Sequence, residues 1–144
     1  MSTTIRWVKL SEGGEVPRHS HAGDAGYDLV VSRDTVIPPH TFVDVHTDIA
    51  VIWPDGMWGR ITGRSSTLRK KGLLVSEGII DNEYTGELFT GVYNLGDQEV
   101  VIKKGERVAQ LIPHMLIGLE WTEIQAEEIP DTKRGSGGFG STGK

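Results

Sequence analysis

The sequence predicts an all-β sandwich or barrel with one short helix and a glycine-rich C-terminal arm. Short apolar segments rich in β-branched and aromatic residues recur along the chain, as they do in strands. The 19 glycines fall in small groups between these segments, which is typical of many tight turns. Only Thr67–Lys71 favours a helix. About ten short strands with a single helix are typical of sandwiches and barrels.

The expected strands follow one another with turn signals between them. Thr41–Ile52 alternates apolar and polar residues and is interrupted near Thr47, so it predicts two strands. Pro54-Asp55-Gly56 is a strong turn signal. The other expected strands cover Thr3–Leu10, Leu29–Val31, Val36–Ile37, Met57–Thr62, Leu73–Val75, Glu87–Tyr93, Glu99–Ile102, Arg107–Ile117 and, as the last strand, Trp121–Ile124.

Composition limits the classes of function. A length of 144 residues suits one domain, and 37% hydrophobic with 24% charged residues suits a packed core. The net charge of −5 argues against a nucleic-acid partner, which would require a basic face, but leaves room for one basic pocket. The absence of cysteine excludes disulfides and thiolate chemistry.

The first ten residues contain two basic side chains, Arg6 and Lys9, and no long apolar run. We expect neither a signal peptide nor a membrane span there. A cytoplasmic location without a membrane partner is therefore the expectation.

The segment Ser76–Leu88 has the pattern around which the site prediction is organised. Asp81 follows two β-branched residues, and Tyr84 comes three positions later. A second strand is expected over Glu87–Tyr93, so the pattern predicts a β-hairpin with an acid at its turn. Such a hairpin places a base and a flat ring against one small ligand. An ordinary surface hairpin with a turn aspartate is the alternative.

A second candidate site is the loop Gly63–Thr67, with the sequence Gly-Arg-Ser-Ser-Thr. Backbone N–H groups, hydroxyls and a guanidinium at a strand end suit phosphate oxygens. A serine-rich loop that caps the helix Thr67–Lys71 is the other interpretation, and the two are compatible because a helix N-terminus favours an anion. Asp28, where a strand begins, either faces a cleft or ends a turn.

Two further polar features have ordinary explanations. His19 and His21 have a spacing that suits a metal on a strand, but no third ligand is close in sequence, so a solvated loop is favoured. Gln110 is a lone amide in an apolar strand, where a hydrogen bond in the core or at an interface explains it.

The composition changes after Gln125, so we divide the chain into a β-barrel domain (1–125) and a flexible arm (126–144). The arm combines Arg134, Phe139 and two hydroxyls with many glycines, which indicates a lid over an anionic ligand that contains a ring. Its end resembles a P-loop, yet a P-loop must open a helix and the sequence stops at Lys144. We therefore reject a P-loop nucleotidase.

Five segments in this order resemble the homotrimeric deoxyuridine triphosphatase (dUTPase) family. The resemblance implies the family's jelly-roll-like β barrel (β-clip), with three active sites at subunit interfaces of a homotrimer. The matching segments, which extend over most of the chain, are Ala25–Leu29, Gly63–Ser66, Gly78–Gly86, Gly105–Leu111 and Arg134–Gly143.

The resemblance implies that the protein hydrolyses dUTP to dUMP and diphosphate with Mg²⁺, which keeps uracil out of DNA and supplies dUMP for dTTP synthesis. Asp81 would be the general base for the attacking water. Asp28 would hold the metal through water. Tyr84 would pack on the deoxyribose and exclude a 2′-hydroxyl.

The remaining implied roles concern base and phosphate binding. The uracil edge would meet the backbone near Val75, Gly78 and Ile79. Phosphates would contact Arg64, Ser65 and Ser66, with Gln110 supporting them from a neighbouring subunit. In the arm, Phe139 beside Gly140 would stack on the uracil, while Arg134, Ser141 and Thr142 would clamp the β- and γ-phosphates.

Two departures and three alternatives accompany this interpretation. The second motif ends Ser66-Thr67 where many relatives have small or aliphatic residues, and we expect little effect. Val75 occupies a position where some relatives have asparagine, so backbone groups must read the base. A dCTP deaminase of the same fold would need a glutamate at the position of Gly91. A nucleotide-gated regulatory binding protein would use the same arm. A purely structural trimer leaves Arg134 and Phe139 unexplained.

Overall fold

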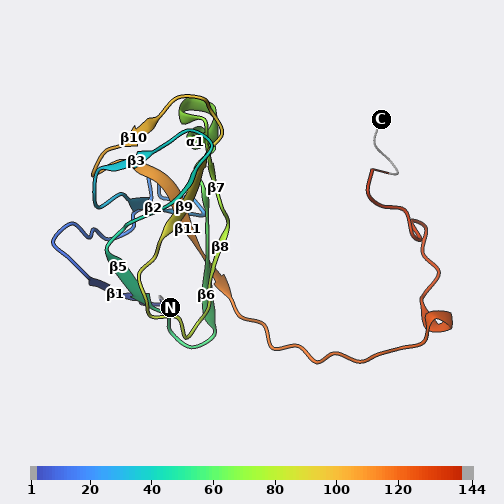
Figure 1. Ribbon diagram of the computed structural model, residues 1–144. Coiled ribbons are helices and arrows are strands. Elements are labelled where there is room, and N and C mark those ends of the chain that lie inside the picture. Colours follow the sequence, from blue (N-terminus) through green and yellow to red (C-terminus); the bar gives the residue numbers. More distant parts are fainter. Residues whose placement is uncertain (1–2, 141–144) are drawn as a thin grey trace.

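The computed structural model describes residues 3–140, and these confirm the predicted all-β class (Figure 1). One α-helix, α1 (Ser65–Lys71), and one 3₁₀ helix, η1 (Ala126–Glu128), accompany the strands. The strands are β1 (Arg6–Lys9), β2 (Tyr27–Val30), β3 (Thr35–Ile37), β4 (Phe42–Val45), β5 (Ile49–Ile52), β6 (Met57–Gly63), β7 (Leu73–Val75), β8 (Gly78–Ile80), β9 (Thr90–Asn94), β10 (Val100–Ile102) and β11 (Arg107–Met115).

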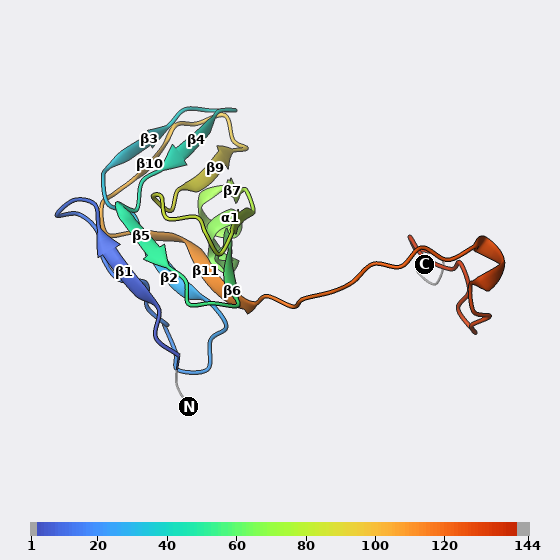
Figure 2. The same cartoon turned by 90° about the horizontal axis from the view of Figure 1, so that it is seen from below.

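The strands of the described part form four antiparallel sheets that curl around a common interior (Figure 2). The largest sheet has the order β2-β11-β6-β8, and a three-stranded sheet has the order β4-β9-β7. The pairs β1-β5 and β3-β10 complete the barrel. Because strands distant in sequence pair throughout, the functional segments are positioned by long-range contacts.

The interior contains two clusters of buried apolar side chains. Leu29, Ile61 and Leu111 belong to the first cluster, beneath the four-stranded sheet. Val92 and Ile102 belong to the second. Each fully buried side chain of this size contributes roughly 1.5–3 kcal/mol relative to exposure. Alternation along β9, in which every second residue is buried, matches the period of two expected for a strand.

The long strand β11 aligns the segments of the second candidate site. Gln110 is paired with Thr62 of β6 on one side and with Asp28 of β2 on the other. A register shift between Arg107 and Ala109 marks a bulge close to that point. The sheet therefore places Asp28 and Gln110 side by side at the end of β6.

Helix α1 begins two residues earlier than the predicted Thr67. The hydroxyl of Thr67 is buried and donates to the carbonyl of Val108 at 2.6 Å, which ties the helix to β11. The helix ends at Gly72, whose φ of 66° is in the left-handed region that glycine adopts without strain.

The predicted hairpin over Ser76–Tyr93 is wrong, because its two strands lie in different sheets. β8 pairs with β6, whereas β9 pairs with β4 and β7. The cause lies in packing: Ile80 is buried in the first apolar cluster and Val92 in the second. Residues 81–89 therefore form a loop that crosses between the sheets.

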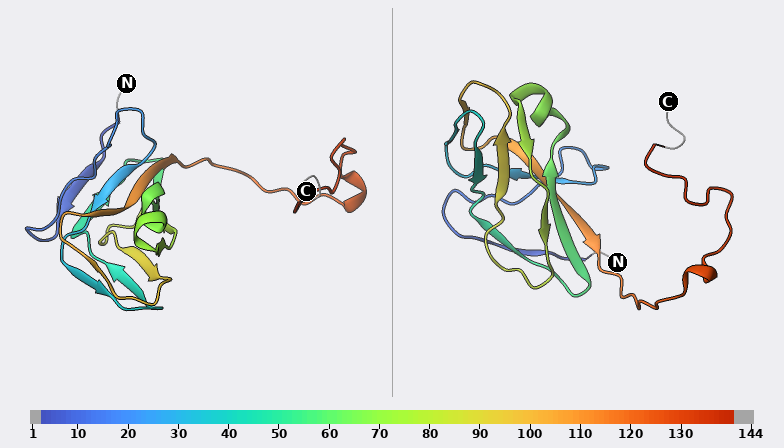
Figure 3. Two further views of the ribbon diagram at one scale, coloured as in Figure 1. Left: turned by 90° about the horizontal axis from the view of Figure 1, so that it is seen from above. Right: turned by 45° about the vertical axis from the view of Figure 1, so that its right-hand side comes forward.

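The predicted last strand, Trp121–Ile124, is also wrong. Residues 116–125 have no regular structure, and Trp121 is 92% exposed. Figures 1 and 3 show the chain leaving the barrel after β11 and running away from it to η1. A strand needs a partner for its backbone groups, and this segment has none among residues 3–140.

Among the described residues, no helix is long and apolar enough to cross a membrane.

Candidate active site

The first part of the candidate site is an open cleft around Asp81. Its volume is about 740 Å³, and Asp81 itself is exposed. The walls come from the loop after β8, from β6 and from the segment that follows β11. The lining residues are Trp58, Ile79, Asp81, Asn82, Glu83, Met115, Leu116 and Ile117.

The turn that presents Asp81 is held by backbone and side-chain hydrogen bonds. The N–H of Tyr84 donates to the carbonyl of Asp81 at 3.0 Å. The amide of Asn82 donates to the carbonyls of Pro54 and Met57 at 3.0 and 2.8 Å, which fixes the turn to the start of β6. A carboxylate held in this way stays available to a ligand in the cleft.

The ring of Tyr84 is also fixed, although 41% of the residue is exposed. Its hydroxyl donates to the carbonyl of Glu87 at 2.8 Å. The ring lies across Gly86, where an added Cβ would come within 2.7 Å of the hydroxyl oxygen. Glycine is therefore required for this approach.

The second part is a pocket of about 430 Å³ at the other end of β6. Asp28, Arg64, Ser65 and Gln110 line it, so Gln110 lies beside Arg64 of its own chain, whereas the resemblance implied that it would act from a neighbouring subunit. Further lining residues, which the sequence analysis did not single out for this site, are Ser20, His21, Asp24, Ala25, Gly26 and Ile112.

Buried Asp28 is the centre of the polar contacts in this pocket. Its Oδ1 atom forms an ion pair with Nε of Arg64 at 2.9 Å, and its Oδ2 atom accepts from the hydroxyl of Ser20 at 2.5 Å. A longer ion pair joins it to Arg107 at 3.8 Å. Gln110 donates to the carbonyl of Gly63 at 3.1 Å. Two guanidinium groups thus lie around the Asp28 carboxylate, and of these Arg64 lines the pocket.

The two pockets have no residue in common. Asp81 follows Ile80, which pairs with Gly59, whereas Arg64 lies five residues further along the chain from Gly59. At about 3.3 Å per strand residue, these points are roughly 16 Å apart along β6. A single chain therefore brings together Asp28, Arg64, Ser65 and Gln110, but it keeps Asp81 and Ile79 separate from them.

The other predicted site residues in the barrel lie between these regions. Val75, half-buried, packs close to Gly63, where an added Cβ would lie 3.3 Å from the valine side chain. Gly78 pairs with Ile61 in the middle of β6. Ser66 is in the first turn of α1. The segment from Val75 to Ile79 is therefore anchored to the same strand as both pockets.

The predicted arm residues lie apart from both pockets in this structure. Phe139 is fully exposed, and Arg134 is exposed with its Nε atom donating to the carbonyl of Gly137. Gly140 has a φ of 88°, which favours glycine. Ser141 and Thr142 lie outside the described residues.

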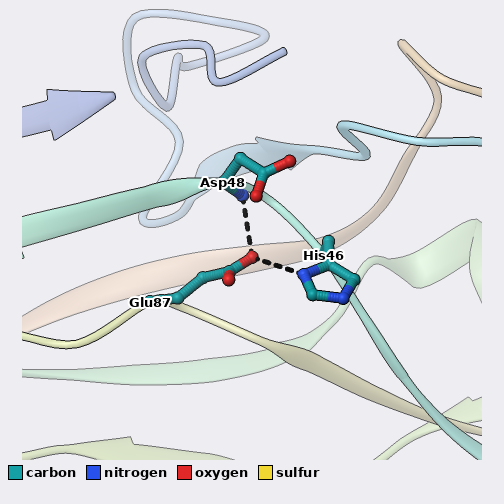
Figure 4. A group of neighbouring side chains, drawn as sticks. All are labelled: His46, Asp48 and Glu87. Atoms are coloured by element: carbon teal, nitrogen blue, oxygen red, sulfur yellow. Dashed lines mark hydrogen bonds and ion pairs between the residues drawn. The ribbon is translucent and has the colours of Figure 1, made fainter. Parts of the chain in front are cut away.

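The histidines considered for a metal have other contacts. His19 stacks on Tyr27 with ring centroids 3.9 Å apart, and the backbone N–H of His21 donates to Asp24. In the described part of the chain, the one cluster with metal-ligand chemistry is His46, Asp48 and Glu87 (Figure 4). The sequence analysis did not single it out, because its members are up to 41 residues apart.

Hydrogen bonds and ion pairs already occupy this cluster. Both carboxylate oxygens of Asp48 contact Arg33, at 2.7 and 3.0 Å. The Arg33 guanidinium holds the pKa of the Asp48 carboxyl well below its usual range. One oxygen of Glu87 lies 2.9 Å from Nδ1 of His46 and accepts from the Asp48 N–H. The cluster is therefore a bonded network that joins the Asp81 loop to the turn between β4 and β5.

The fold and the two pockets define a small all-β protein with a polar pocket that contains Arg64 and a separate carboxylate in a cleft. The chain belongs to the dUTPase family, whose sequence profile matches residues 12–143.

Curated relatives support the assignment over nearly the whole chain. The mitochondrial deoxyuridine 5'-triphosphate nucleotidohydrolase of Homo sapiens is 42% identical over 140 residues, which is 97% of this chain and 55% of the human protein. The enzyme of Candida albicans with the same name is 41% identical, over 93% of this chain and 84% of its own length. That of Paramecium bursaria Chlorella virus 1 is 41% identical over 94% of both chains.

Solved structures agree with the fold. The dUTPase of Staphylococcus bacteriophage 80alpha with dUPNHPP superposes with a TM-score of 0.89 at 29% identity, over 99% of this chain and all of the phage chain. A mutant dUTPase of S. aureus phage phi11, described with a structural Mg(II) ion, has a TM-score of 0.78 at 27% identity, over 88% of this chain and 100% of its own. The predicted jelly-roll-like dUTPase fold is confirmed.

Proposed function

We propose that this chain hydrolyses dUTP to dUMP and diphosphate. Family membership and about 40% identity to named dUTP nucleotidohydrolases support the proposal. The observation that carries it is the Asp81 turn: an exposed carboxylate, held by Asn82 and the Tyr84 backbone, lines a cleft within the segment that resembles the family motif.

Asp81 is the general base in this proposal. Its carboxylate accepts a proton from a water molecule as that water attacks the α-phosphorus, and the bond to the bridging oxygen of the diphosphate breaks. The turn holds the carboxylate in place before substrate arrives, so little reorganisation is needed.

The pocket that contains Arg64 binds the triphosphate. Arg64 supplies a fixed guanidinium, and Ser65 and Ser66 add hydroxyl and backbone donors at the start of α1. These groups neutralise charge that would repel the attacking water and that grows in the transition state. Gln110, held by the carbonyl of Gly63, supports the same region.

The family is generally dependent on a divalent metal, and we propose Mg²⁺ for this chain. The pocket fits Mg²⁺ through water rather than by direct ligation, because both oxygens of Asp28 already contact Arg64 and Ser20. When bound with substrate, the ion would neutralise phosphate charge. The role of Asp28 is to hold water beside the phosphates.

Tyr84 and the backbone around it select the nucleoside. The fixed ring packs on the deoxyribose and leaves no room for a 2′-hydroxyl. Backbone groups near Val75, Gly78 and Ile79 read the uracil edge, since neither valine nor isoleucine offers a polar side chain. Anchoring of this segment to β6 supports a rigid base site.

We further propose a homotrimer in which copies of the chain complete one another's sites. The separation of Asp81 from Arg64 within one chain supports this, because both must reach one substrate. The arm, 126–144, acts as a unit distinct from the barrel domain, 1–125. It brings Phe139 over the uracil and Arg134 to the phosphates, with Gly140, Ser141 and Thr142 beside them.

The expected cytoplasmic location stays a prediction. The printed names of the Homo sapiens and Dictyostelium discoideum relatives place those proteins in the mitochondrion. Fractionation of cells that express the chain measures its location directly.

Turnover of dUTP, dTTP, dCTP and UTP with Mg²⁺ tests the proposal. We expect diphosphate release from dUTP alone at a substantial rate. Ammonia release from dCTP would indicate the deaminase instead. That alternative would need a glutamate at position 91, where this chain has a glycine, which cannot carry protons.

A further inference from the structure

Glu87 closes the loop that begins at Asp81, and its side chain is only 14% exposed. One carboxylate oxygen serves two partners: it lies 2.9 Å from Nδ1 of His46 and accepts from the backbone N–H of Asp48 at 3.0 Å (Figure 4). Both partners belong to the turn between β4 and β5, so the carboxylate fastens the loop to a different sheet.

The partners of Glu87 are themselves fixed. Asp48 has a φ of 54°, and both its carboxylate oxygens are bound by Arg33. The imidazole of His46 packs edge-on against Phe89, with ring centroids 5.1 Å apart. The next residue, Leu88, is fully buried and accepts from the hydroxyl of Thr47. Glu87 is therefore held by the partners of its side chain and by the buried residue that follows it, Leu88.

The same residue holds the Tyr84 ring from its backbone, because the carbonyl of Glu87 accepts the tyrosine hydroxyl at 2.8 Å. A shift of the Glu87 backbone would move this acceptor and let the ring turn. Gly86 keeps the ring close, as a Cβ there would collide with it. The position of the ring thus depends on a carboxylate that does not touch it.

We propose that Glu87 is a positioning residue: anchored by His46 and the Asp48 N–H, it sets the Tyr84 ring and thereby the preference for deoxyribose over ribose triphosphates. The inference rests on the proposed function, in which Tyr84 packs on the sugar. It concerns selectivity rather than the bond-breaking step, because Glu87 does not line the cleft around Asp81.

The test compares kcat/KM for dUTP and UTP in Glu87→Ala and Glu87→Gln. The amide oxygen of glutamine still accepts both hydrogen bonds, so Glu87→Gln should keep the native dUTP/UTP ratio. Glu87→Ala should lower the ratio by about tenfold or more, mainly through KM. Tyr84→Phe should lower the ratio similarly. The double variant, Glu87→Ala with Tyr84→Phe, should lower it no further, because both changes interrupt the same series of contacts from Glu87 to the ring. Glu99→Ala, which removes an exposed carboxylate just before β10, is the control.

A second readout does not depend on activity. Hydrogen exchange at the Asp48 amide should be faster in Glu87→Ala than in the native chain, and unchanged in Tyr84→Phe. If Glu87→Ala folds poorly, His46→Ala, which removes a partner with a 35% exposed side chain, should show a smaller loss of the ratio. A native dUTP/UTP ratio in both Glu87→Ala and His46→Ala would overturn the inference. A native chain without dUTP turnover would instead refute the proposed function.

Discussion

Buried Asp28 and partly exposed Arg64 form an ion pair, with Oδ1 and Nε 2.9 Å apart, that joins β2 to the residue before α1. The guanidinium also donates to the carbonyl of Arg107 at 3.1 Å. Three motifs that are far apart in sequence therefore meet at one arginine. In the proposed enzyme this pair aims the guanidinium at the pocket that receives the phosphates.

Arg64→Lys should weaken dUTP binding by about tenfold or more. Lysine keeps the charge, but its single ammonium cannot bond Asp28, the Arg107 carbonyl and a phosphate in the fixed planar geometry of arginine. Titration with a non-hydrolysable dUTP analogue measures the change. Arg69→Lys, in the last turn of the same helix, is the matched control. Equal affinity of the two variants would contradict the role of Arg64.

Asp81→Asn should lower kcat by about 10²–10⁴, because an amide cannot accept the proton of the attacking water. Binding of the analogue should change little, since asparagine has the same shape and the turn is held by Asn82 and the Tyr84 backbone. Single-turnover kinetics together with titration separate the two effects. Turnover close to native would remove Asp81 from the role of general base.

Acid should unfold the protein partly through Asp48. Hydrogen bonding and charge from Arg33 lower the pKa of this carboxyl in the folded state, whereas the unfolded value is about 3.9. The contribution to stability is therefore fully present above about pH 4 and is lost as the pH falls toward the folded pKa. Arg33→Gln should reduce stability near neutral pH and flatten its dependence on pH below about 5.

Urea unfolding at a series of pH values checks this prediction. The native chain and Arg33→Gln should converge in stability as the pH falls, because protonated Asp48 no longer gains from the guanidinium. Parallel curves for the two proteins would show that the Arg33–Asp48 pair does not contribute to the pH dependence of stability.

Removal of residues 126–144 should abolish dUTP turnover and leave the melting temperature of the barrel nearly unchanged. The reason is that residues 126–140, the described part of this segment, are almost wholly exposed and contribute to neither apolar cluster. Calorimetry and diphosphate release measure the two properties. A truncated chain with native turnover would contradict the proposed role of Arg134 and Phe139.

Local sequence signals predicted much of the fold. The alternation over Thr41–Ile52 yielded β4 and β5, with the break at Thr47 in the right place, and the Pro54–Gly56 turn precedes β6 as expected. These signals work because the period of two and the turn residues are properties of a few neighbouring residues.

Pairing could not be predicted in the same way. β8 and β9 are neighbours in sequence and looked like a hairpin, yet Ile80 and Val92 are buried in different clusters, so the strands separate. Trp121–Ile124 has strand-forming residues but no partner strand within residues 3–140. The choice of partner depends on the packed interior, which no short window of sequence contains.

The candidate site, like the fold, was predicted where the signal is local and missed where it depends on distant contacts. Motifs located Asp28, Arg64, Ser65 and Gln110, and the structure brings these four together. The anchoring of Glu87 by His46 was missed, because 41 residues separate the two and each looks like an ordinary polar surface residue in the sequence. Contacts between loops on different sheets leave no local signal.

The central claim is that one active site takes Asp81 from one copy of the chain and Arg64 from another. Asp81→Asn and Arg64→Ala should each be inactive alone, and the decisive measurement is dUTP turnover after the two are unfolded, mixed equally and refolded together. Random assembly gives about a quarter of the sites both native residues, so activity should recover to about a quarter of native. A mixture as inactive as either variant alone would show that both residues act within one chain and would contradict the account.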